Sequence, residues 1–314
     1  MTLDGRTSDR SNTAQPLHEA RGRSQAAEAR RQLLAPLPVA ERRLELAGIS
    51  TAVLEGGDGP PVVLLHGPSG YAAHWMRVIP DLVSSHRVIV PDLPGHGASQ
   101  LLEGELDVER VLGWLDELIE HTCASPPRLV GQLVGGAIAA RFASRHGDRA
   151  RQLVLVDTFG LRPFQPAPEF GAALQRALAQ PTPETHQSLW RLCAHDLDRL
   201  QRQIGVSWQP FEAYNLDRMR TPSVQAAVGS LMQHFGAPAI EPAELARISV
   251  PTSLIWGRHD LATPLAVAEA ASARYGWPLH VIEDANDDPP IEQPEALVRA
   301  LRAVFAGARR EAVR

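Results

Sequence analysis

The sequence predicts an α/β protein with a mostly parallel, doubly wound sheet of about eight strands. Short, continuous apolar runs such as Val62–Leu65 are typical of strands that helices cover on both faces. These runs alternate along the chain with helical patterns such as Asp107–Thr122. The alternation favours a parallel sheet with helices packed on both of its faces. It stops after Val156 and resumes at Thr252, which predicts a helical insertion between two strands.

Apolar runs bounded by turn residues place the strands and the helices that connect them. The expected strands are Arg42–Leu46, Ser50–Leu54, Val62–Leu65, Arg87–Val90, Arg128–Val130, Leu153–Val156, Thr252–Trp256 and Leu279–Ile282. The expected helices between and after them are Ala72–Val83, Asp107–Thr122, Val134–Arg145, Pro264–Tyr275 and Pro294–Phe305.

The insertion covers residues 159–248 and carries helical patterns separated by prolines. It is too long for a structureless loop in a compact domain. Its expected helices are Glu169–Leu178, Glu184–Ala194, Leu197–Ile204, Pro210–Met219 and Ser223–Phe235. Residues 41–158 and 249–308 then form the main domain, and residues 309–314 form a C-terminal tail.

The N-terminal residues 1–40 differ in composition from the rest of the chain. They are rich in Ser, Arg, Ala, Gln and Glu, and the short helical pattern Gln25–Leu34 develops no long apolar face. We interpret this segment as a mobile extension. The alternative is a docking arm for a protein partner.

Composition and charge exclude several classes of protein. The chain carries 31 basic and 36 acidic residues and a formal net charge of -5, without a basic stripe, which argues against nucleic-acid binding. All the basic residues are Arg, so chemistry that needs a Lys is excluded. No apolar run is long enough to span a membrane. Two cysteines, Cys123 and Cys193, provide no disulfide framework, so we expect a cytoplasmic protein without membrane contact.

The sequence indicates no cofactor and no metal. It contains no Gly-x-Gly-x-x-Gly motif for a dinucleotide. We considered four histidines as metal ligands: His74, His186, His195 and His234. They show no His-x-x-x-His or other recognised ligand spacing.

Five short motifs follow predicted strands in a fixed order. They are His66-Gly67, the run Pro91–Ser99, Gly131-Gln132-Leu133-Val134-Gly135, the run Trp256–Asp260 and the run Glu292–Glu295. As a set, and over residues 42–304, they resemble the α/β-hydrolase fold with a helical lid. The resemblance makes residues 159–248 the lid. It also implies a nucleophile, an acid and a histidine in that chain order, with an oxyanion hole.

This sequence departs from the resembled pattern at the residues that carry the chemistry. Leu133 stands at the nucleophile position, and its hydrocarbon side chain cannot attack a carbonyl. Asp260 matches the acid, whereas Asp287 falls on the histidine position. We expect a protein that is not a Ser-His-Asp hydrolase, with Asp260 and Asp287 as candidate catalytic residues.

The same resemblance places a binding pocket above the strand ends. One oxyanion donor position is Pro68, which has no N–H, and the other is Val134. The candidate binding residues are Gly67, Pro68, Ser69, Trp75, Leu133, Val134, Trp190 and Trp208. Their apolar and aromatic side chains predict an apolar or aromatic small molecule as the ligand.

Two hypotheses of function remain from the sequence. In the first, Asp260 and Asp287 face each other, one of the two pKa values rises, and the pair performs non-hydrolytic acid–base chemistry on the small molecule. In the second, the protein is non-catalytic and binds a small molecule or a protein partner, the latter through the N-terminal extension.

Overall fold

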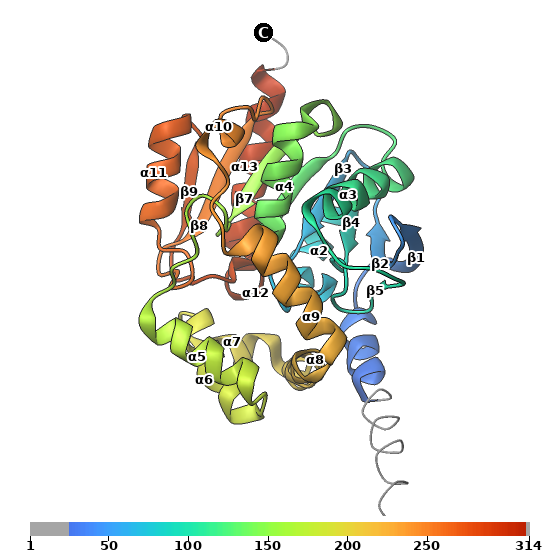
Figure 1. Ribbon diagram of the computed structural model, residues 1–314, viewed down its shortest axis with the longest axis vertical. Helices are drawn as coiled ribbons and strands as arrows, with labels where there is room; N and C mark the ends of the chain where they lie inside the picture. The colour runs from blue at the N-terminus through green and yellow to red at the C-terminus, as the bar shows by residue number, and fades with distance from the viewer. Residues whose placement is uncertain (1–24, 312–314) are drawn as a thin grey trace, which may run out of the picture.

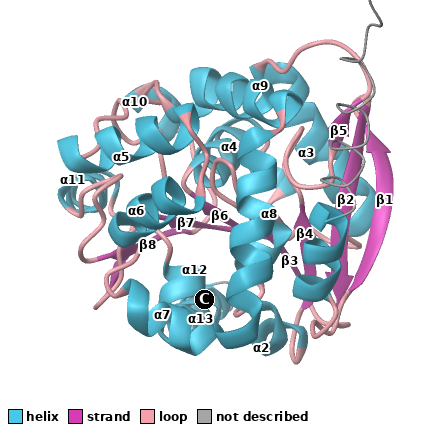
Figure 2. Cartoon of the chain, turned by 90° about the horizontal axis from the view of Figure 1, so that it is seen from below, coloured by secondary structure: helices cyan, strands magenta, loops and turns pink. Residues whose placement is uncertain are grey.

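The computed structural model describes residues 25–311 and has one nine-stranded sheet with helices on both faces (Figures 1 and 2). Its strands follow the order β1-β2-β4-β3-β6-β7-β8-β9, and β5 pairs with β2. They are β1 (Ala40–Leu46), β2 (Ile49–Gly56), β3 (Pro61–Leu65), β4 (Arg87–Pro91), β5 (Gln100–Leu101), β6 (Arg128–Gln132), β7 (Gln152–Val156), β8 (Thr252–Gly257) and β9 (Leu279–Ile282).

Six neighbouring strands are parallel, namely β4, β3, β6, β7, β8 and β9, and the strands β1, β2 and β5 add an antiparallel edge. The predicted fold class is therefore confirmed. All eight expected strands form, extended by up to two residues at their ends. The two-residue strand β5 was missed because so short a segment carries no readable periodicity.

The helices pack in two layers against the sheet and in a third group beyond the ends of its strands (Figure 1). They are α2 (Ile79–Val83), α3 (Val108–Thr122), α4 (Val134–Arg145), α5 (Pro168–Ala179), α6 (Pro183–Cys193), α7 (Leu197–Ile204), α8 (Trp208–Arg220), α9 (Pro222–Leu231), α10 (Pro242–Leu245), α11 (Ala266–Tyr275), α12 (Pro289–Glu292) and α13 (Pro294–Glu311).

Each face of the sheet has its own apolar core. On one face, fully buried Trp114 of α3, Phe142 of α4 and Trp256 of β8 belong to the larger cluster. On the other face, Trp75 packs in a second cluster with side chains of α2 and with Leu301 of α13. Because strand residues alternate between the faces, consecutive apolar residues in β3 contribute to both cores.

The segment between β7 and β8 consists of helices joined by loops. It holds α5 to α10, and no strand forms there among the described residues. The helices α5 to α8 lie beyond the end of the sheet, and α9 runs back toward the main domain (Figure 1). The expected helix Ser223–Phe235 ends at Leu231 and continues as a π-helical turn, Met232–Gly236.

Two predicted elements near proline residues form differently. The expected helix Ala72–Val83 is broken into the 3-10 turn Ala72–Trp75 and α2, because Pro80 lacks the N–H that a continuous helix would need. The proline-rich loop after β9 contains the short helix α12. Pro289 and Pro290 occupy its first turn, where a missing N–H carries no cost.

Residues 25–34 form a helix that packs on the main domain, which corrects the prediction of mobility for this part of the N-terminal extension. Ala26, Ala29 and Leu33 are buried in a third apolar cluster with Tyr71 and Tyr214. The rest of the predicted extension, residues 1–24, lies outside the described residues.

A buried ion pair anchors this N-terminal helix. The Arg30 guanidinium lies 2.9 Å from Asp92 Oδ2, and it also donates to Glu41. Asp92 is fully buried and accepts backbone N–H groups from Ala72 and Ala98. Asp92 therefore joins the N-terminal helix to two loops at the ends of the strands.

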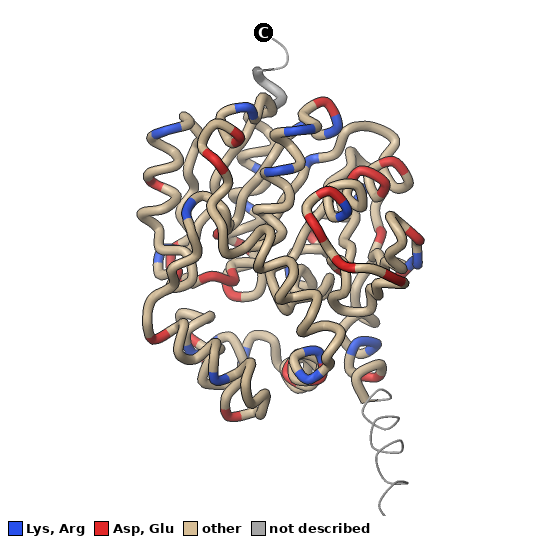
Figure 3. The backbone as a smooth tube through the Cα atoms, in the orientation of Figure 1, with Lys and Arg blue, Asp and Glu red and all other residues tan. Residues whose placement is uncertain are grey.

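Charged residues are interspersed along the chain, and the acidic and basic positions show no one-signed stripe in this view (Figure 3). Within residues 25–311, no helix is both long enough and apolar enough to cross a membrane.

Substituting Arg30 tests whether the N-terminal helix is part of the folded domain. We expect Arg30→Ala to lower the free energy of unfolding by about 3 kcal/mol, because it leaves the buried Asp92 without its cation. The measurement is urea unfolding followed by circular dichroism. Arg31→Ala is the matched control: the Arg31 side chain is 75% exposed in the same helix, and its loss is expected to change the free energy of unfolding by less than about 0.5 kcal/mol. Equal effects of the two changes would show that the helix does not dock.

Candidate active site

The turn between β6 and α4 holds Leu133 in a strained backbone conformation. Leu133 has φ 47° and ψ −115°, a region that costs a non-glycine residue about 1–3 kcal/mol. The turn is tight enough that a Cβ on Gly131 would collide with the carbonyl of Gly135, and one on Gly135 would collide with that of Leu65. The glycines of this motif are thus required by the close approach of α4 to β6 and β3.

Helix α4 begins directly after this strained residue. Val134 is its first residue, so the Val134 N–H has no acceptor within the helix. The helix has twelve residues, and its dipole adds partial positive charge at this end. The position suits a developing oxyanion.

The loop after β3 forms the opposite wall. Pro68 offers no N–H, and Ser69 adopts a positive φ of 58°. Gly67 faces Leu133 closely: a Cβ there would lie 3.0 Å from Leu133 Cδ1. The Leu133 side chain therefore packs against this loop, and only 7% of the residue is exposed.

A cavity of about 160 Å³ lies between these two turns and the helical segment. Its polar lining residues are Ser69, His74, Gln132, His186, Asn215, Asp287 and Asp288. Its apolar lining residues include Leu133, Phe159, Phe164, Phe170, Leu174, Leu189, Trp190, Met219 and Met232. The volume suits a group the size of a benzene ring.

The structure brings six of the ten predicted site residues to this cavity. They are Gly67, Pro68, Ser69, Leu133, Trp190 and Asp287. Trp75 is fully buried in the core on the other face of the sheet, so its assignment to the pocket is wrong. Trp208 stands behind Trp190, with an edge-to-face ring contact at 5.9 Å, and does not reach the cavity.

Val134 and Asp260 also lie outside the cavity lining. The side chain of Val134 is buried in the core, and only its backbone N–H matters for the proposed chemistry. Asp260 is buried behind the cavity wall beside Asp157.

Asp157 and Asp260 form a coupled pair of buried carboxyl groups at the ends of β7 and β8. Asp260 Oδ1 accepts the N–H groups of Ala262 and Thr263 at 2.7 and 2.8 Å. Burial raises the pKa of Asp260 to about 7, against these hydrogen bonds. Burial and the charge of Asp260 hold the pKa of Asp157 well above its usual range. Because two buried negative charges repel each other, this neighbourhood favours the protonated form of the two carboxyl groups.

Asp287 extends this acidic group into the cavity. Its side chain is buried, and Oδ1 has no hydrogen-bond donor. Burial first, and then the charge of Asp260, raises the pKa of Asp287 well above its usual range. The charge of Asp260 thus acts on Asp287, although only Asp287 lines the cavity, and Asp157 is a further buried acid that sequence reasoning missed.

Two further acids, Asp288 and Glu292, are buried in the same loop. Gln132 donates to Asp288 Oδ1 at 3.0 Å, and the backbone N–H groups of His195 and Asn286 donate to Glu292. Burial raises the pKa of Asp288 to about 7 and that of Glu292 to about 8. The sequence signal was a run of acidic residues after a strand, of which the sequence analysis selected only Asp287.

The cavity also contains polar residues that the sequence analysis did not select. Burial lowers the pKa of both His74 and His186 to about 4, so both imidazoles are neutral at pH 7. Cys193 contacts Asp287 through its thiol, and burial together with the nearby acids raises the pKa of Cys193 well above its usual range. None of these residues belongs to a recognisable motif, because the insertion brings two of them to the cavity from outside the parallel sheet.

The fold and the arrangement of these turns define an α/β hydrolase. The family model described as "alpha/beta hydrolase fold" matches residues 60–294, and the chain belongs to this family.

Among curated proteins, the chain is similar to the pimeloyl-[acyl-carrier protein] methyl ester esterase of Chromobacterium violaceum. The two are 30% identical over 262 residues, which cover 78% of this chain and 94% of the relative. The chain is also 28% identical to the 2-hydroxy-6-oxo-6-phenylhexa-2,4-dienoate hydrolase of Comamonas testosteroni, over 67% of this chain and 75% of the relative. The crystal structure of a membrane phospholipase A superposes with a TM-score of 0.77 at 24% identity, covering 94% of this chain and 95% of that one.

These relatives correct the predicted function. Proteins that share most of the chain are named as an esterase and a hydrolase, so the prediction of non-hydrolytic acid–base chemistry is wrong. The same names contradict the alternative of a non-catalytic binding protein.

The buried acids predict an unusual dependence of stability on pH. Their folded-state pKa values lie above the usual value of about 4 for an unfolded carboxyl group, so the folded protein binds more protons than the unfolded chain. Stability is then greatest below about pH 4 with respect to these groups, and is lost as the pH rises through about 7 to 8.

We expect the melting temperature to fall between pH 5 and pH 8, as measured by differential scanning calorimetry. Asp260→Asn removes one titrating group and is expected to make this fall shallower. Asp198→Asn, in an exposed position on α7, serves as the control with an unchanged slope. A melting temperature that rises over this range would contradict the raised pKa values.

Proposed function

We propose that the protein hydrolyses neutral esters of small apolar or aromatic acids by direct attack of water, with Asp287 as the general base. One observation carries the proposal: the carboxyl group of Asp287, whose Oδ1 has no hydrogen-bond partner, lines a largely apolar cavity beside the β6–α4 turn. Family membership and the names of the relatives support hydrolysis.

In this proposal the family's catalytic set has lost two members. Leu133 occupies the nucleophile position and has no atom that can attack. Asp287 occupies the position of the histidine. A carboxylate with a raised pKa is a stronger base than an ordinary one, so it can take a proton from water. Burial and the charge of the neighbouring Asp260 maintain the raised pKa of Asp287.

The reaction follows from these positions. Asp287 accepts a proton while the water oxygen bonds to the ester carbonyl carbon. The Val134 N–H, at the positive end of α4, donates to the resulting oxyanion, and Ser69 lies on the opposite wall as a further donor. The tetrahedral intermediate collapses, the C–O bond to the alcohol breaks, and the proton passes from Asp287 to the leaving alkoxide. The products are an acid and an alcohol.

Charge in the cavity favours a neutral substrate. Among the described residues, no arginine lines the cavity, and Asp287 and Asp288 are acidic. A substrate with a carboxylate, such as the dienoate in the name of one relative, would meet repulsion without a compensating cation. A neutral ester, such as the methyl ester in the name of the other relative, would not.

We propose that the helical segment between β7 and β8 acts as a lid over the cavity. It supplies the lining residues Phe170 of α5, Leu189 and Trp190 of α6 and Met219 of α8. These side chains close the cavity on the side opposite Leu133. They exclude bulk water, which strengthens the electrostatic interactions inside.

Ester hydrolysis without a covalent intermediate is the first test. We expect turnover of p-nitrophenyl acetate and phenyl acetate, without labelling by a fluorophosphonate probe, because no activated serine lies in the turn. The double variant Leu133→Ser with Asp287→His is the positive control for labelling, since the strained turn is already in place. Labelling of the wild type at Ser69 would show that this serine, and not water, is the nucleophile.

Asp287→Asn tests the base directly. We expect it to lower kcat by about 10²- to 10⁴-fold, because the amide keeps the size of the side chain and cannot accept the proton. Asp198→Asn is the matched control on an exposed carboxylate. Unchanged kcat in Asp287→Asn, or loss of all activity in Cys193→Ala, would overturn Asp287 as the base.

The pH profile tests the protonation state that the proposal needs. Asp287 is active only without its proton, and its pKa is raised, so we expect kcat/KM to increase with pH, with a midpoint well above the usual range of a carboxyl group. The measurement is the pH dependence of initial rates, corrected for spontaneous ester hydrolysis. A plateau that already begins at pH 5 would contradict the raised pKa of the base.

A further inference from the structure

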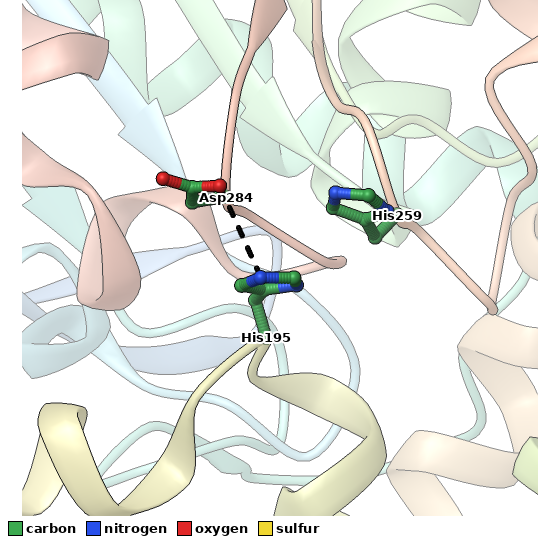
Figure 4. Close-up of side chains that lie close together, drawn as sticks. All are labelled: His195, His259 and Asp284. Carbon is green, nitrogen blue, oxygen red and sulfur yellow. Dashed lines mark ion pairs between the residues drawn. The ribbon is translucent and has the colours of Figure 1, made fainter.

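Two histidines and an aspartate meet on the surface where the helical segment joins the main domain. His195 follows α6, His259 follows β8 and Asp284 follows β9. One ligand atom from each lies within 4.8 Å of the other two, and all three side chains are exposed. Figure 4 shows the three side chains turned toward a common space. Within residues 25–311, no other group of three His, Cys, Asp or Glu side chains meets this spacing.

The two imidazole rings lie almost parallel. Their centroids are 4.5 Å apart, with an angle of 20° between the planes. His195 Nε2 lies 3.9 Å from Asp284 Oδ1, longer than a hydrogen bond. The cluster thus offers two imidazole nitrogens and one carboxylate oxygen as ligand atoms, and the distance between His195 and Asp284 is too long for a hydrogen bond.

The backbone around each of these residues is fixed by other contacts. The His195 N–H donates to the buried Glu292 at 2.6 Å, and the His259 N–H donates to the Ala285 carbonyl at 2.9 Å. Arg258 and Glu283, the residues next to His259 and Asp284, form a two-pronged ion pair across the two loops. The three backbone positions are therefore held in place before any ligand binds.

We propose that His195, His259 and Asp284 bind a Zn²⁺ ion. Two imidazoles and one carboxylate are a typical donor set for Zn²⁺, whereas Ca²⁺ and Mg²⁺ take oxygen ligands. Ligands about 2.0–2.1 Å from one ion are separated by at most about 4.2 Å. The ligand atoms now lie within 4.8 Å of one another, and the three side chains are exposed, so they can rotate until these atoms converge on the ion. Water completes the coordination.

The sequence did not predict this site because its ligands come from three distant segments. The separation of His195 from His259 exceeds 60 residues, so no local spacing motif exists. Only the packing of the helical segment against the strand ends places the two rings together.

Such an ion would link the helical segment to the two loops that carry the buried acids. His259 directly precedes Asp260, and Asp284 lies three residues before Asp287. A bond from His195 to the same ion would hold α6 and α7 against these loops. The ion would lie outside the cavity, because none of its three ligands lines the cavity. Its role is thus to fix the position of the helical segment.

Zinc binding can be measured without a substrate. The untagged, full-length protein is treated with a chelator, dialysed and titrated with ZnCl₂ by isothermal titration calorimetry. We expect one ion per chain, with at least tenfold weaker binding in His195→Ala, in His259→Ala and in Asp284→Asn. His121→Ala, on an exposed face of α3, is the matched control with unchanged affinity. Unchanged binding in the first three variants, or no stoichiometric binding in the wild type, would overturn the site.

A second readout checks that the ion connects the two parts of the fold. Zn²⁺ is expected to raise the melting temperature of the wild type, because it binds the folded chain preferentially. The double variant His195→Ala with His259→Ala is expected to keep its circular dichroism spectrum and to lose this shift. An equal shift in the double variant would place the ion elsewhere. Neither measurement depends on esterase activity, so failure of the proposed hydrolysis would leave this test intact.

Discussion

The close contact between β6, α4 and β3 is the constraint on which the site depends. The surroundings of three glycines, Gly131, Gly135 and Gly136, leave no room for a Cβ. Because these residues have no side chain, α4 can begin in close contact with the sheet. The strain that follows is concentrated at Leu133, and the first N–H of α4 belongs to the next residue, Val134. The turn keeps its shape without a reactive side chain, because backbone packing and not the side chain at 133 determines it.

Burial of carboxyl groups sets the chemistry available around this turn. Five acids, Asp157, Asp260, Asp287, Asp288 and Glu292, lie at the ends of the parallel strands with few compensating cations nearby. Backbone N–H groups and Gln132 donate to several of their oxygens, whereas Asp157 Oδ2 and Asp287 Oδ1 have no hydrogen-bond partner. The cost in stability and the strength of the base thus arise from the same desolvation.

The sequence was sufficient for the sheet and for part of the site. Buried strands such as Val62–Leu65 and tight glycine motifs follow from local patterns, so their positions, and those of Leu133 and Asp287, could be predicted. Trp75 was misplaced because an aromatic residue after a strand can face either side of the sheet, and here it packs in the core on the face opposite the cavity. Asp157, His186 and Cys193 carry no motif, and only the path of the helical segment brings the last two to the cavity.

The docked helix of residues 25–34 gives the chain an unusual order of assembly. This helix precedes the main domain in the sequence, and its buried side chains pack against Tyr71 and against Tyr214 of α8. About 180 residues separate the helix from Tyr214, and contacts over such distances in sequence pay a large loop-closure entropy and form late. Until α8 is packed, the apolar face of this helix lacks its contact with Tyr214, whereas the ion-pair partners of Arg30, Asp92 and Glu41, lie in the main domain. The docking of this helix is therefore completed only when the helical segment is in place.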